Sequence, residues 1–311
     1  MRKRFDAAVV GIQVLDMLVT GVDASLFHRD STTADVIRLA PGGDALNQAI
    51  ALGQLGNRTA LLGVLGSDRL GDTLLSILQD YPVEIFDRRV DRNTSISIVV
   101  VDTEGERHFL RRSGHNDALC YELLDQEVIK NAGILSIAGA MAFPNLDGEG
   151  MIRLLRLAKD AGALTAMDLF INRKEYDMAV IAAAFAHTDF LMPSLREAEF
   201  VTSETNPGHI AAALRELGAK VVVLKMGEKG CYLLDDAGPR IIPAFKARVV
   251  DTTGAGDNFA AAFLHGVNRG WDMDTCARFA CAAGALAVEH VGASGFLQGE
   301  EQVLTRMQAS G

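Results

Sequence analysis

A carboxylate follows a glycine-rich turn in the C-terminal third of the chain. The stretch VVDTTGAGDNF spans residues 249–259, and its two glycines, Gly254 and Gly256, come just before Asp257. Glycine lets a ligand approach the main chain closely, and the start of the helix expected next favours an anion. A carboxylate placed there would repel that anion unless it had a chemical task. The pattern therefore predicts phosphoryl transfer, with Asp257 as the base that orients and deprotonates an alcohol.

The alternative interpretation is an ordinary glycine-rich turn between a strand and a helix, with Asp257 as an acidic residue at the helix start. That interpretation leaves unexplained why Asp251, Thr252 and Thr253 crowd the same turn. The phosphate-binding motif G-x-x-x-x-G-K-[ST] is absent from the sequence, and no complete G-x-G-x-x-G follows a strand pattern. The turn itself would therefore have to bind the phosphate.

A second glycine-rich motif lies in the N-terminal third, where GGDALNQAIALGQLG begins at Gly42. Gly42 and Gly43 would let a ligand press against the backbone. Asp44, expected as a helix N-cap, and Asn47 lie three residues apart in the first helical turn. They offer acceptors and a donor to one small volume, as a hydroxyl-rich ligand requires. A glycine turn with a capping aspartate and a solvated asparagine explains the motif equally well.

Polar residues also follow two of the apolar runs. Ala7–Leu15 is typical of a buried strand, and Asp16 comes directly after it. Ligands of open α/β sheets bind beyond the carboxyl ends of the strands, so Asp16 is a candidate contact. Asp168, Asn172 and Arg173 follow a later strand pattern and could reach the same ligand. Taken alone, Asp16 fits an ordinary loop aspartate as well.

The composition is that of an acidic globular protein. The chain has 311 residues, of which 49% are apolar, and a formal net charge of −10. We expect one large α/β domain over residues 1–311, and the charge argues against nucleic acid as a partner. No apolar run reaches membrane-spanning length. The four cysteines are scattered without a C-x-x-C pair, which indicates a reduced, cytoplasmic setting.

Strand and helix patterns alternate along most of the chain. Beyond residue 131, apolar runs such as Ile134–Ala138, Leu164–Leu169 and Val221–Lys225 are separated by helical stretches. This alternation predicts a three-layer, doubly wound, mostly parallel α/β sheet. Residues 17–40 and 94–112 break the rhythm and indicate about four antiparallel strands. We expect these strands to form a small β-sheet lid over the site.

The two glycine motifs together resemble the signatures of the ribokinase-like, or phosphofructokinase-B-type (PfkB), carbohydrate kinase family. GGDALNQAIALGQLG resembles the N-terminal signature and DTTGAGDNF the C-terminal one, and the resemblance covers essentially the whole chain. It implies a ribokinase-like fold and a kinase that phosphorylates a hydroxyl of a small sugar or sugar acid with ATP. It also implies Mg²⁺ and, in many members, a monovalent cation such as K⁺.

The resemblance assigns roles to residues at matching positions. Asp257 corresponds to the catalytic base, and the backbone of Gly254, Ala255 and Gly256 to the anion hole for the transferring phosphoryl group. Substrate contacts correspond to Asp16, Gly42, Gly43, Asn47 and Asp257. ATP contacts correspond to Ser194, Lys225, Gly227, Gly230, Gly254 and Gly256. Asn258 stands where relatives usually carry a small residue, and the sequence offers no physical account of it.

Metal positions are implied in the same way. Glu197 matches the glutamate of an Asn-x-x-Glu element that organises Mg²⁺ through water, although Ser194 replaces the asparagine. Asp251 and Thr253 match a monovalent-cation loop, with carbonyls of residues 287–292 as partners. The implied ligands are therefore ATP, Mg²⁺ and K⁺.

Other functions remain open beside the sugar kinase. A nucleoside kinase on the same fold needs aromatic surface to stack a base. The lid stretches hold Phe27 and Phe109 but are otherwise charged, with Arg107, His108, Arg111 and Arg112. These arginines favour an anionic substrate, or they form a solvated face or a dimer edge. A catalytically silent sugar-binding protein should have lost the base or the anion hole, and both are present.

We expect a homodimer that pairs through the lid. Exposed strand edges commonly need covering, and the lid strands of the resembled family often pair across a dimer. The expected partners are therefore a small-molecule sugar, ATP and a second copy of the chain, without nucleic acid or membrane.

Overall fold

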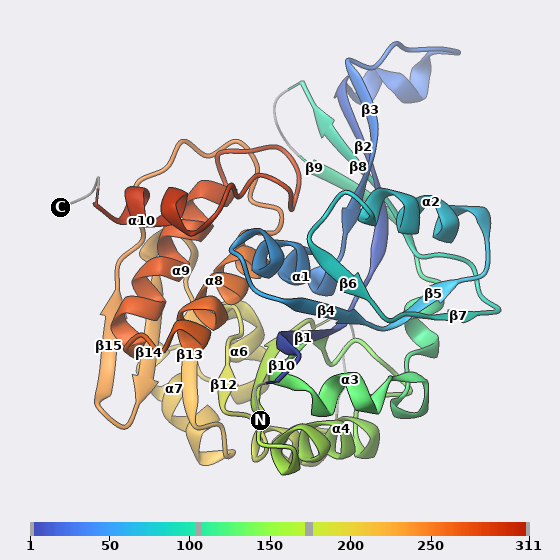
Figure 1. Cartoon of the computed structure of the whole chain (residues 1–311). Coiled ribbons are helices and arrows are strands. Elements are labelled where there is room, and N and C mark those ends of the chain that lie inside the picture. The colour runs from blue at the N-terminus through green and yellow to red at the C-terminus, as the bar shows by residue number, and fades with distance from the viewer. Residues whose placement is uncertain (1–2, 104–106, 172–176, 309–311) are drawn as a thin grey trace.

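The protein is built on a nine-stranded sheet, which lies at the centre of Figure 1. The computed structural model describes residues 3–103, 107–171 and 177–308. The strand order is β15-β14-β13-β12-β11-β10-β1-β4-β6. In chain order the strands are β1 (Phe5–Gly11), β4 (Thr59–Leu62), β6 (Val83–Ile85), β10 (Ala132–Ala140), β11 (Leu164–Leu169), β12 (Phe190–Leu191), β13 (Val221–Lys225), β14 (Cys231–Asp235) and β15 (Gly238–Ile242).

The strands from β6 to β13 in this order run parallel, and β14 and β15 extend one edge antiparallel. Central strands are apolar along their length because both faces of the sheet are covered. In β1, Ala7 and Val9 pack into one layer of core, whereas Ala8 and Val10 pack into the other. The predicted doubly wound, three-layer α/β architecture is confirmed.

Helices cover both faces of this sheet (Figure 1). One core layer includes side chains from α1 (Asp44–Gln54), α2 (Arg69–Leu78), α8 (Ala255–Arg269), α9 (Met273–Ala287) and α10 (Glu300–Gln308). The other includes side chains from α3 (Gln126–Lys130), α4 (Glu149–Asp160), α5 (Met178–Phe185), α6 (Leu195–Thr202) and α7 (Pro207–Glu216). Helix α1 packs against α8, so the two glycine motifs, more than 200 residues apart in sequence, become neighbours.

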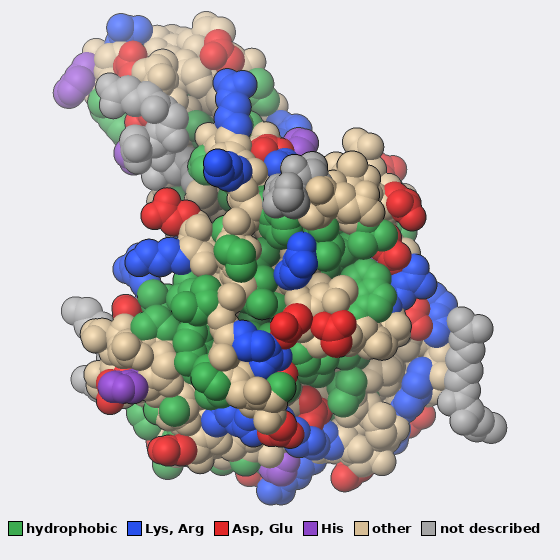
Figure 2. Space-filling model, turned by 90° about the vertical axis from the view of Figure 1, so that its left-hand side faces the viewer, with side chains coloured by type: hydrophobic (Ala, Val, Ile, Leu, Met, Phe, Trp, Pro, Cys, Tyr) green, Lys and Arg blue, Asp and Glu red, His purple; other side chains and the backbone are tan. Residues whose placement is uncertain are grey.

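A separate four-stranded sheet, the lid, stands out from the body in Figures 1 and 2. Its order is β3 (Val36–Gly42), β2 (Val14–Val22), β8 (Ile96–Asp102) and β9 (Arg107–Arg112). The expectation of an all-antiparallel lid is wrong, because β2 and β8 pair in parallel. Both strands leave the body at the lid's base and run outward together, so only their outer partners, β3 and β9, return antiparallel.

Several shorter elements complete the fold. Strands β5 (Val64–Gly66) and β7 (Arg88–Val90) form a small parallel pair. Turns of 3₁₀ helix occur at η1 (Ala24–His28), η2 (His115–Ala118), η3 (Tyr121–Leu123) and η4 (Gly227–Lys229). Over the described ranges, none of the helices combines the length and apolar character that crossing a bilayer requires.

Candidate active site

The N-terminus of α8 forms the predicted anion-binding turn. Its N-cap is Gly254, whose φ of 71° lies in the left-handed region, and a Cβ there would come within 2.4 Å of Ala293 O. Both facts require glycine. The first N–H groups of a helix have no acceptor within the helix and attract an anion. The Ala255 amide is partly engaged, since it donates to Thr252 O at 3.3 Å, so Gly256 and Asp257 offer the better-placed amides.

Asp257 lies in this first turn and is only 9% exposed. Asn47 of α1 donates from Nδ2 to Asp257 Oδ2 at 2.8 Å. Burial raises the pKa of Asp257 to about 6, while the Asn47 hydrogen bond and the Lys225 charge oppose the rise. At neutral pH the group is therefore mostly ionised, and it can accept a proton from an alcohol.

Asn47 presents a free acceptor beside this base. Its Oδ1 is buried and meets no hydrogen-bond partner among the described residues. An unpaired buried acceptor costs about 1–3 kcal/mol, so a hydroxyl donor at this point is favoured. The turn before α1 is tight: Gly43 has a φ of 91°, and a Cβ there would come within 2.7 Å of Ile12 O. Gly43 is also the N-cap of α1, so the expected capping role of Asp44 is wrong.

Asp16 reaches the site from the lid rather than from the end of a core strand. The apolar run expected as one strand is broken after Gly11, where β1 ends, and Asp16 lies within β2. Its carboxylate packs on Gly42, where a Cβ would come within 2.0 Å of Asp16 Oδ2. Burial raises the pKa of Asp16 to about 7, and Arg111 opposes the rise. Gly42 is thus needed to make room for Asp16.

These residues surround one cavity of about 250 Å³ between the lid and the body. Polar and charged groups on its wall include Asp16, Asp44, Asn47, Ser95, Ser97, Arg111, Arg112, Ser113, Asn116, Asp117, Thr253 and Asp257. Of the residues predicted to contact substrate, Asp16, Gly43, Asn47 and Asp257 line this cavity, and Gly42 supports it. This polar cavity therefore reaches the N-terminus of α8, where Thr253, Gly254 and Asp257 line it.

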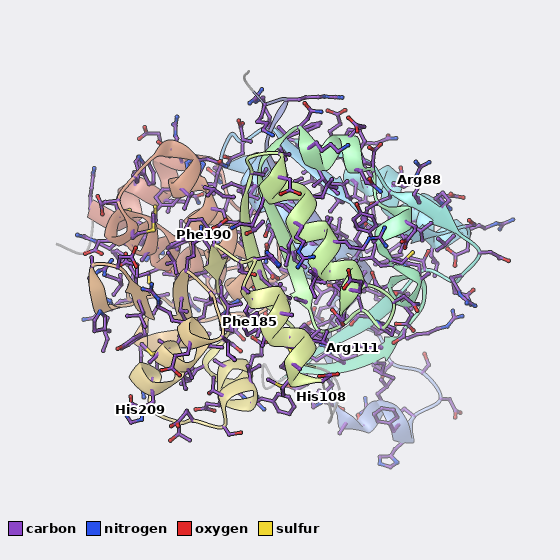
Figure 3. The ribbon with its side chains drawn as sticks, turned by 90° about the horizontal axis from the view of Figure 1, so that it is seen from below. Arg88, His108, Arg111, Phe185, Phe190 and His209 are labelled. Carbon is purple, nitrogen blue, oxygen red and sulfur yellow. The ribbon has the colours of Figure 1, made fainter. Side chains whose placement is uncertain are left out.

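Two aromatic side chains on the cavity wall, Phe143 and Phe170, were not predicted from the sequence. Phe143 and Phe170 line the cavity together with Phe109 of β9. Phe143 and Phe170 follow β10 and β11, in loops without a motif that would have singled them out. Arg111 lies over the Phe109 ring at 4.6 Å. Figure 3 shows Arg111 and His108 on the lid side, apart from the core residues Phe185 and Phe190.

Lys225 and Asp168 form an ion pair at the carboxyl edge of the main sheet. Lys225 Nζ lies 2.7 Å from Asp168 Oδ1 and 2.6 Å from Oδ2. Burial alone would lower the pKa of Lys225, but the charges of Asp168 and Glu197 more than offset it, so this pKa is raised. Burial raises the pKa of Asp168 to about 7 against the influence of Lys225. Because the ammonium bonds both oxygens, we take the pair as charged.

The predicted nucleotide residues gather around the end of β13. Gly227 and Gly230 bound the η4 turn that follows Lys225, with φ values of 59° and 84°. Ser194 and Glu197 form a capping box at the start of α6. Glu197 Oε2 accepts from Ser194 N at 2.8 Å and from Ser194 Oγ at 2.6 Å. The serine that replaces the expected asparagine therefore orients Glu197.

The predicted cation loop joins two segments of the chain. Asp251 is buried; its Oδ1 accepts from Thr253 N at 2.7 Å and its Oδ2 from Gly292 N at 2.9 Å. Asn258 donates from Nδ2 to Gly254 O at 2.8 Å and to Ala293 O at 2.9 Å. Asn258 thus ties the anion-binding turn to the loop after α9, which accounts for its size.

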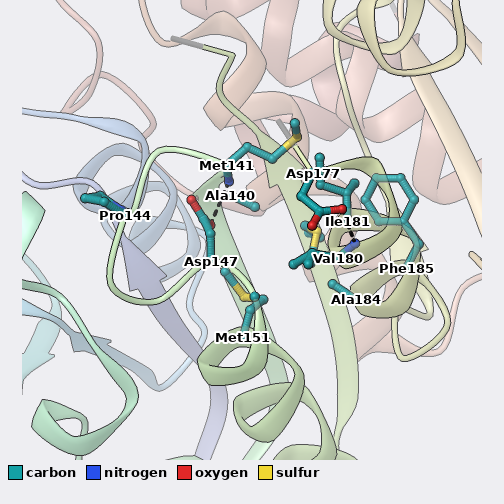
Figure 4. A pocket seen from close by; sticks show the side chains of 12 residues that line it. Ala140, Met141, Pro144, Asp147, Met151, Asp177, Val180, Ile181, Ala184 and Phe185 are labelled. Carbon is teal, nitrogen blue, oxygen red and sulfur yellow. Dashed lines mark hydrogen bonds between the residues drawn. The ribbon is translucent and has the colours of Figure 1, made fainter. Parts of the chain in front are cut away.

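A second cavity of about 260 Å³ lies between α4 and α5 (Figure 4). Its wall is largely apolar, and its two carboxylates accept hydrogen bonds from backbone N–H groups. Asp147 accepts from Met141 N and Phe143 N, and Asp177 accepts from Ala179 N and Val180 N. Among the described residues, none of those predicted for the site lines this cavity. Asn172 and Arg173, predicted as possible ligand contacts, lie outside the described residues.

The fold and the site together define a phosphotransferase class, and the family model for the pfkB family carbohydrate kinase matches residues 5–298. The chain belongs to this family and is a carbohydrate kinase, for which ATP is the phosphoryl donor.

Individual relatives agree with this assignment. The chain is 29% identical to "Fructokinase-1" of Oryza sativa subsp. japonica, over 96% of this chain and 97% of the relative. It is 24% identical to "5-dehydro-2-deoxygluconokinase" of Clostridium perfringens, over 92% and 88%. It is similar to the structure of Arabidopsis thaliana ribokinase complexed with ribose and ATP, with a TM-score of 0.80, 25% identity and 99% of both chains covered.

Proposed function

We propose that the protein transfers the γ-phosphoryl group of ATP to a hydroxyl of a small sugar or sugar acid. The observation that carries this proposal is the buried Asp257 carboxylate, held by Asn47 at 2.8 Å where the sugar-sized cavity meets the start of α8. Asp257 would take the proton of the attacking hydroxyl, and the Gly254–Gly256 turn would stabilise charge on the transferring group.

The substrate would be held by groups from both the body and the lid. Asp16 and the free Asn47 Oδ1 accept hydrogen bonds from sugar hydroxyls, while the Gly42–Gly43 turn lets the sugar approach the backbone. Positioning of this kind accounts for much of the catalysis when the transition state is loose. Arg111 and Arg112 on the same wall support an acidic substrate.

Mg²⁺ and a monovalent cation belong to this proposal. Among the described residues, no cluster of three His, Cys, Asp or Glu side chains would hold a metal directly. Mg²⁺ commonly keeps waters and binds through phosphates and one or two carboxylates, which suits Glu197 in its capping box. The ion would neutralise charge on the phosphates. A monovalent cation would lie at Asp251 and Thr253, whose loop is hydrogen-bonded to Gly292 through the Asp251 carboxylate.

A nucleoside kinase is the second candidate, favoured by one observation. Phe109, Phe143 and Phe170 give the cavity the aromatic surface that a nucleobase needs. A catalytically silent sugar-binding protein is disfavoured because Asp257 is present and buried beside the anion-binding turn. The cytoplasm, where ATP is available and thiols stay reduced, is the compartment we propose.

A substrate panel read by ADP release tests these proposals. D-fructose, D-ribose, 5-dehydro-2-deoxy-D-gluconate and adenosine would each be offered with ATP and Mg²⁺, with K⁺ present or replaced by tetramethylammonium. The sugar-kinase proposal expects turnover with a sugar or sugar acid, and loss of that turnover by 100-fold or more, in order of magnitude, in Asp257→Asn. Asp160→Asn, on an exposed residue of α4, is the control. Turnover with adenosine alone, or a fully active Asp257→Asn, would overturn it.

A further inference from the structure

Lys225 ends β13 with its ammonium group beneath the start of α8. Lys225 Nζ would lie 3.2 Å from a Cβ placed on Gly256, the residue before the base. The side chain is 14% exposed. Its positive charge acts on each of the buried carboxyls Asp44, Asp168 and Asp257. The ammonium group is therefore next to the amides that would receive the transferring phosphoryl group.

Asp168 is built to hold this ammonium in place. Its carboxylate, 4% exposed, accepts Lys225 Nζ on both oxygens, Leu169 N at 2.9 Å and the Nε2 of Gln48 at 3.4 Å. Gln48 Oε1 in turn accepts from Ser136 Oγ at 2.9 Å. Side chains from β10, β11, β13 and α1 thus fix one lysine position.

Such a pair has little value as a stabilising element. Removing two charges from water costs several kcal/mol per ion, in order of magnitude, and apolar side chains of similar volume are often as stable. Gln48 and Ser136, the buried polar side chains linked to Asp168 by a chain of hydrogen bonds, are neutral, so they carry no charge for Lys225 to balance. Buried charge pairs beside a reaction site are more typical of function than of folding.

We propose that Lys225 is a catalytic residue that binds the transferring phosphoryl group, and that Asp168 is the positioning residue that keeps its ammonium beneath the Gly254–Gly256 turn. This inference rests on the function proposed above. Two N–H groups of Lys225 stay on Asp168, and the third donates to a phosphoryl oxygen. The sugar oxygen forms its bond to the γ-phosphorus while the bond to the bridging oxygen of ADP breaks. The hydroxyl proton goes to Asp257, and Lys225 keeps its own proton throughout.

The test uses three variants of the full-length chain and one matched control. Lys225→Met keeps the length of the side chain without its charge, Asp168→Asn removes the anchor, and the double variant removes both charges. Lys246→Met changes an exposed lysine outside the predicted nucleotide turn and outside the cavity. We expect kcat to fall roughly 100- to 1,000-fold in Lys225→Met, with the KM of the sugar changed less than about threefold, and to be unchanged in Lys246→Met.

The double variant separates catalysis from folding. If the pair were only structural, removing both charges would restore the melting temperature and kcat together. The proposal expects the melting temperature to recover and kcat to stay as low as in Lys225→Met. A second readout is binding of ADP with aluminium fluoride, which imitates the transferring group. We expect Lys225→Met to bind ADP alone like the wild type but to lose the gain from fluoride.

Two results would overturn the proposal. A Lys225→Met variant, or a double variant, with wild-type kcat would remove the catalytic role and leave the proposed kinase reaction standing. A wild-type protein that phosphorylates nothing in the panel would overturn the proposed function and this inference together. The two failures are therefore distinguishable in the same set of assays.

Discussion

In the proposed reaction Asp257 acts as the base, so turnover should follow the ionisation of its carboxyl. Burial raises the pKa of its carboxyl to about 6, and only the ionised form can accept a proton. We therefore expect kcat to be low in acid and to rise to a plateau above about pH 6–7. Measuring kcat across pH 5–8 at saturating substrate would check this. A flat profile would contradict the assignment of Asp257 as base.

The raised pKa of Asp257 also makes the unfolding free energy depend on pH. The folded protein keeps the Asp257 proton above the ordinary pKa of 3.8, where the unfolded chain has already lost it. The folded state therefore binds more protons than the unfolded state between about pH 4 and 6, and stability contributed by this group falls as pH rises. We expect Asp257→Asn to match the wild type in unfolding free energy near pH 4 and to exceed it at pH 7. Urea unfolding at both pH values, with Asp160→Asn as control, measures this difference.

Asn258 is the residue whose presence the sequence could not explain, and its bonds predict a role in holding the anion-binding turn. Replacing it by alanine removes the Nδ2 donor from Gly254 O and Ala293 O, although Gly254 O keeps the backbone N–H of residue 258 at 2.9 Å. A buried carbonyl left unpaired, as expected for Ala293 O, costs about 1–3 kcal/mol. We expect Asn258→Ala to lower the melting temperature and to reduce kcat roughly tenfold with little change in the KM of the sugar. A variant that lost stability without losing turnover would assign Asn258 to folding alone.

At the scale of elements, helix α8 offers an internal comparison. Gly254 and Gly270 cap its two ends with φ values of 71° and 72°. A Cβ on Gly254 would meet Ala293 O at 2.4 Å, whereas a Cβ on Gly270 meets nothing within 4 Å. Gly270→Ala should therefore show the backbone strain alone, about 1 kcal/mol.

Gly254→Ala should show that strain together with displacement of the anion-binding turn. We expect an unfolding free energy lower than that of Gly270→Ala and kcat reduced at least 100-fold, in order of magnitude, while Gly270→Ala keeps wild-type turnover. Urea unfolding and ADP release on the two variants provide the comparison. Equal turnover in both would mean that the turn does not bind the phosphoryl group.

Sequence reasoning succeeded where the signal is local. Strand runs such as Val221–Lys225 and the glycine turns at Gly43 and Gly254 depend on nearby residues, so their structure follows from hydrophobic pattern and backbone freedom. It failed where distant segments meet. The parallel pairing of β2 with β8 and the place of Asp16 in the lid depend on tertiary contacts.

The candidate site divides in the same way. Asp257 and Asn47 were predicted because each lies in a recognisable motif. Phe143 and Phe170 lie in loops that only the folded chain brings to the cavity. The contact between Asp168 and Lys225 likewise depends on the strand order β11-β12-β13 in the sheet. Spacing in the sequence does not reveal that order.

At the scale of the whole molecule, the lid has two different faces. The cross-strand row Ala40, Asp16, Ser97 and Arg111 includes three residues of the substrate cavity. The next row along the strands, Leu39, Met17, Ile98 and Leu110, points to the opposite face because successive side chains alternate. In that row all four side chains, one from each lid strand, are apolar.

The apolar row carries a prediction about assembly. Leu110 in this row is 56% exposed, and Ile37, which pairs with Val19 further along the same face, is 69% exposed. Such exposure is costly for a lone chain with a lid standing free of its body. We propose that two lids pair through this face, giving a solution mass of twice the 33.3 kDa chain. Light scattering on a sizing column at micromolar concentration measures it.

A charged double variant tests the pairing. Ile37→Asp with Leu110→Asp should dissociate the dimer, because burying four carboxylates in one small interface costs more than the apolar contacts return. Phe27→Asp, on a residue 82% exposed in η1 and outside this row, is the matched control and should stay dimeric.

Since Asp16 and Arg111 lie on the other face of the same strands, a lid without its partner should hold the sugar less firmly. We therefore expect a monomer whose KM for sugar rises severalfold while its KM for ATP stays within twofold. A monomeric wild type, or a double variant that remains dimeric, would show that this face does not join two chains.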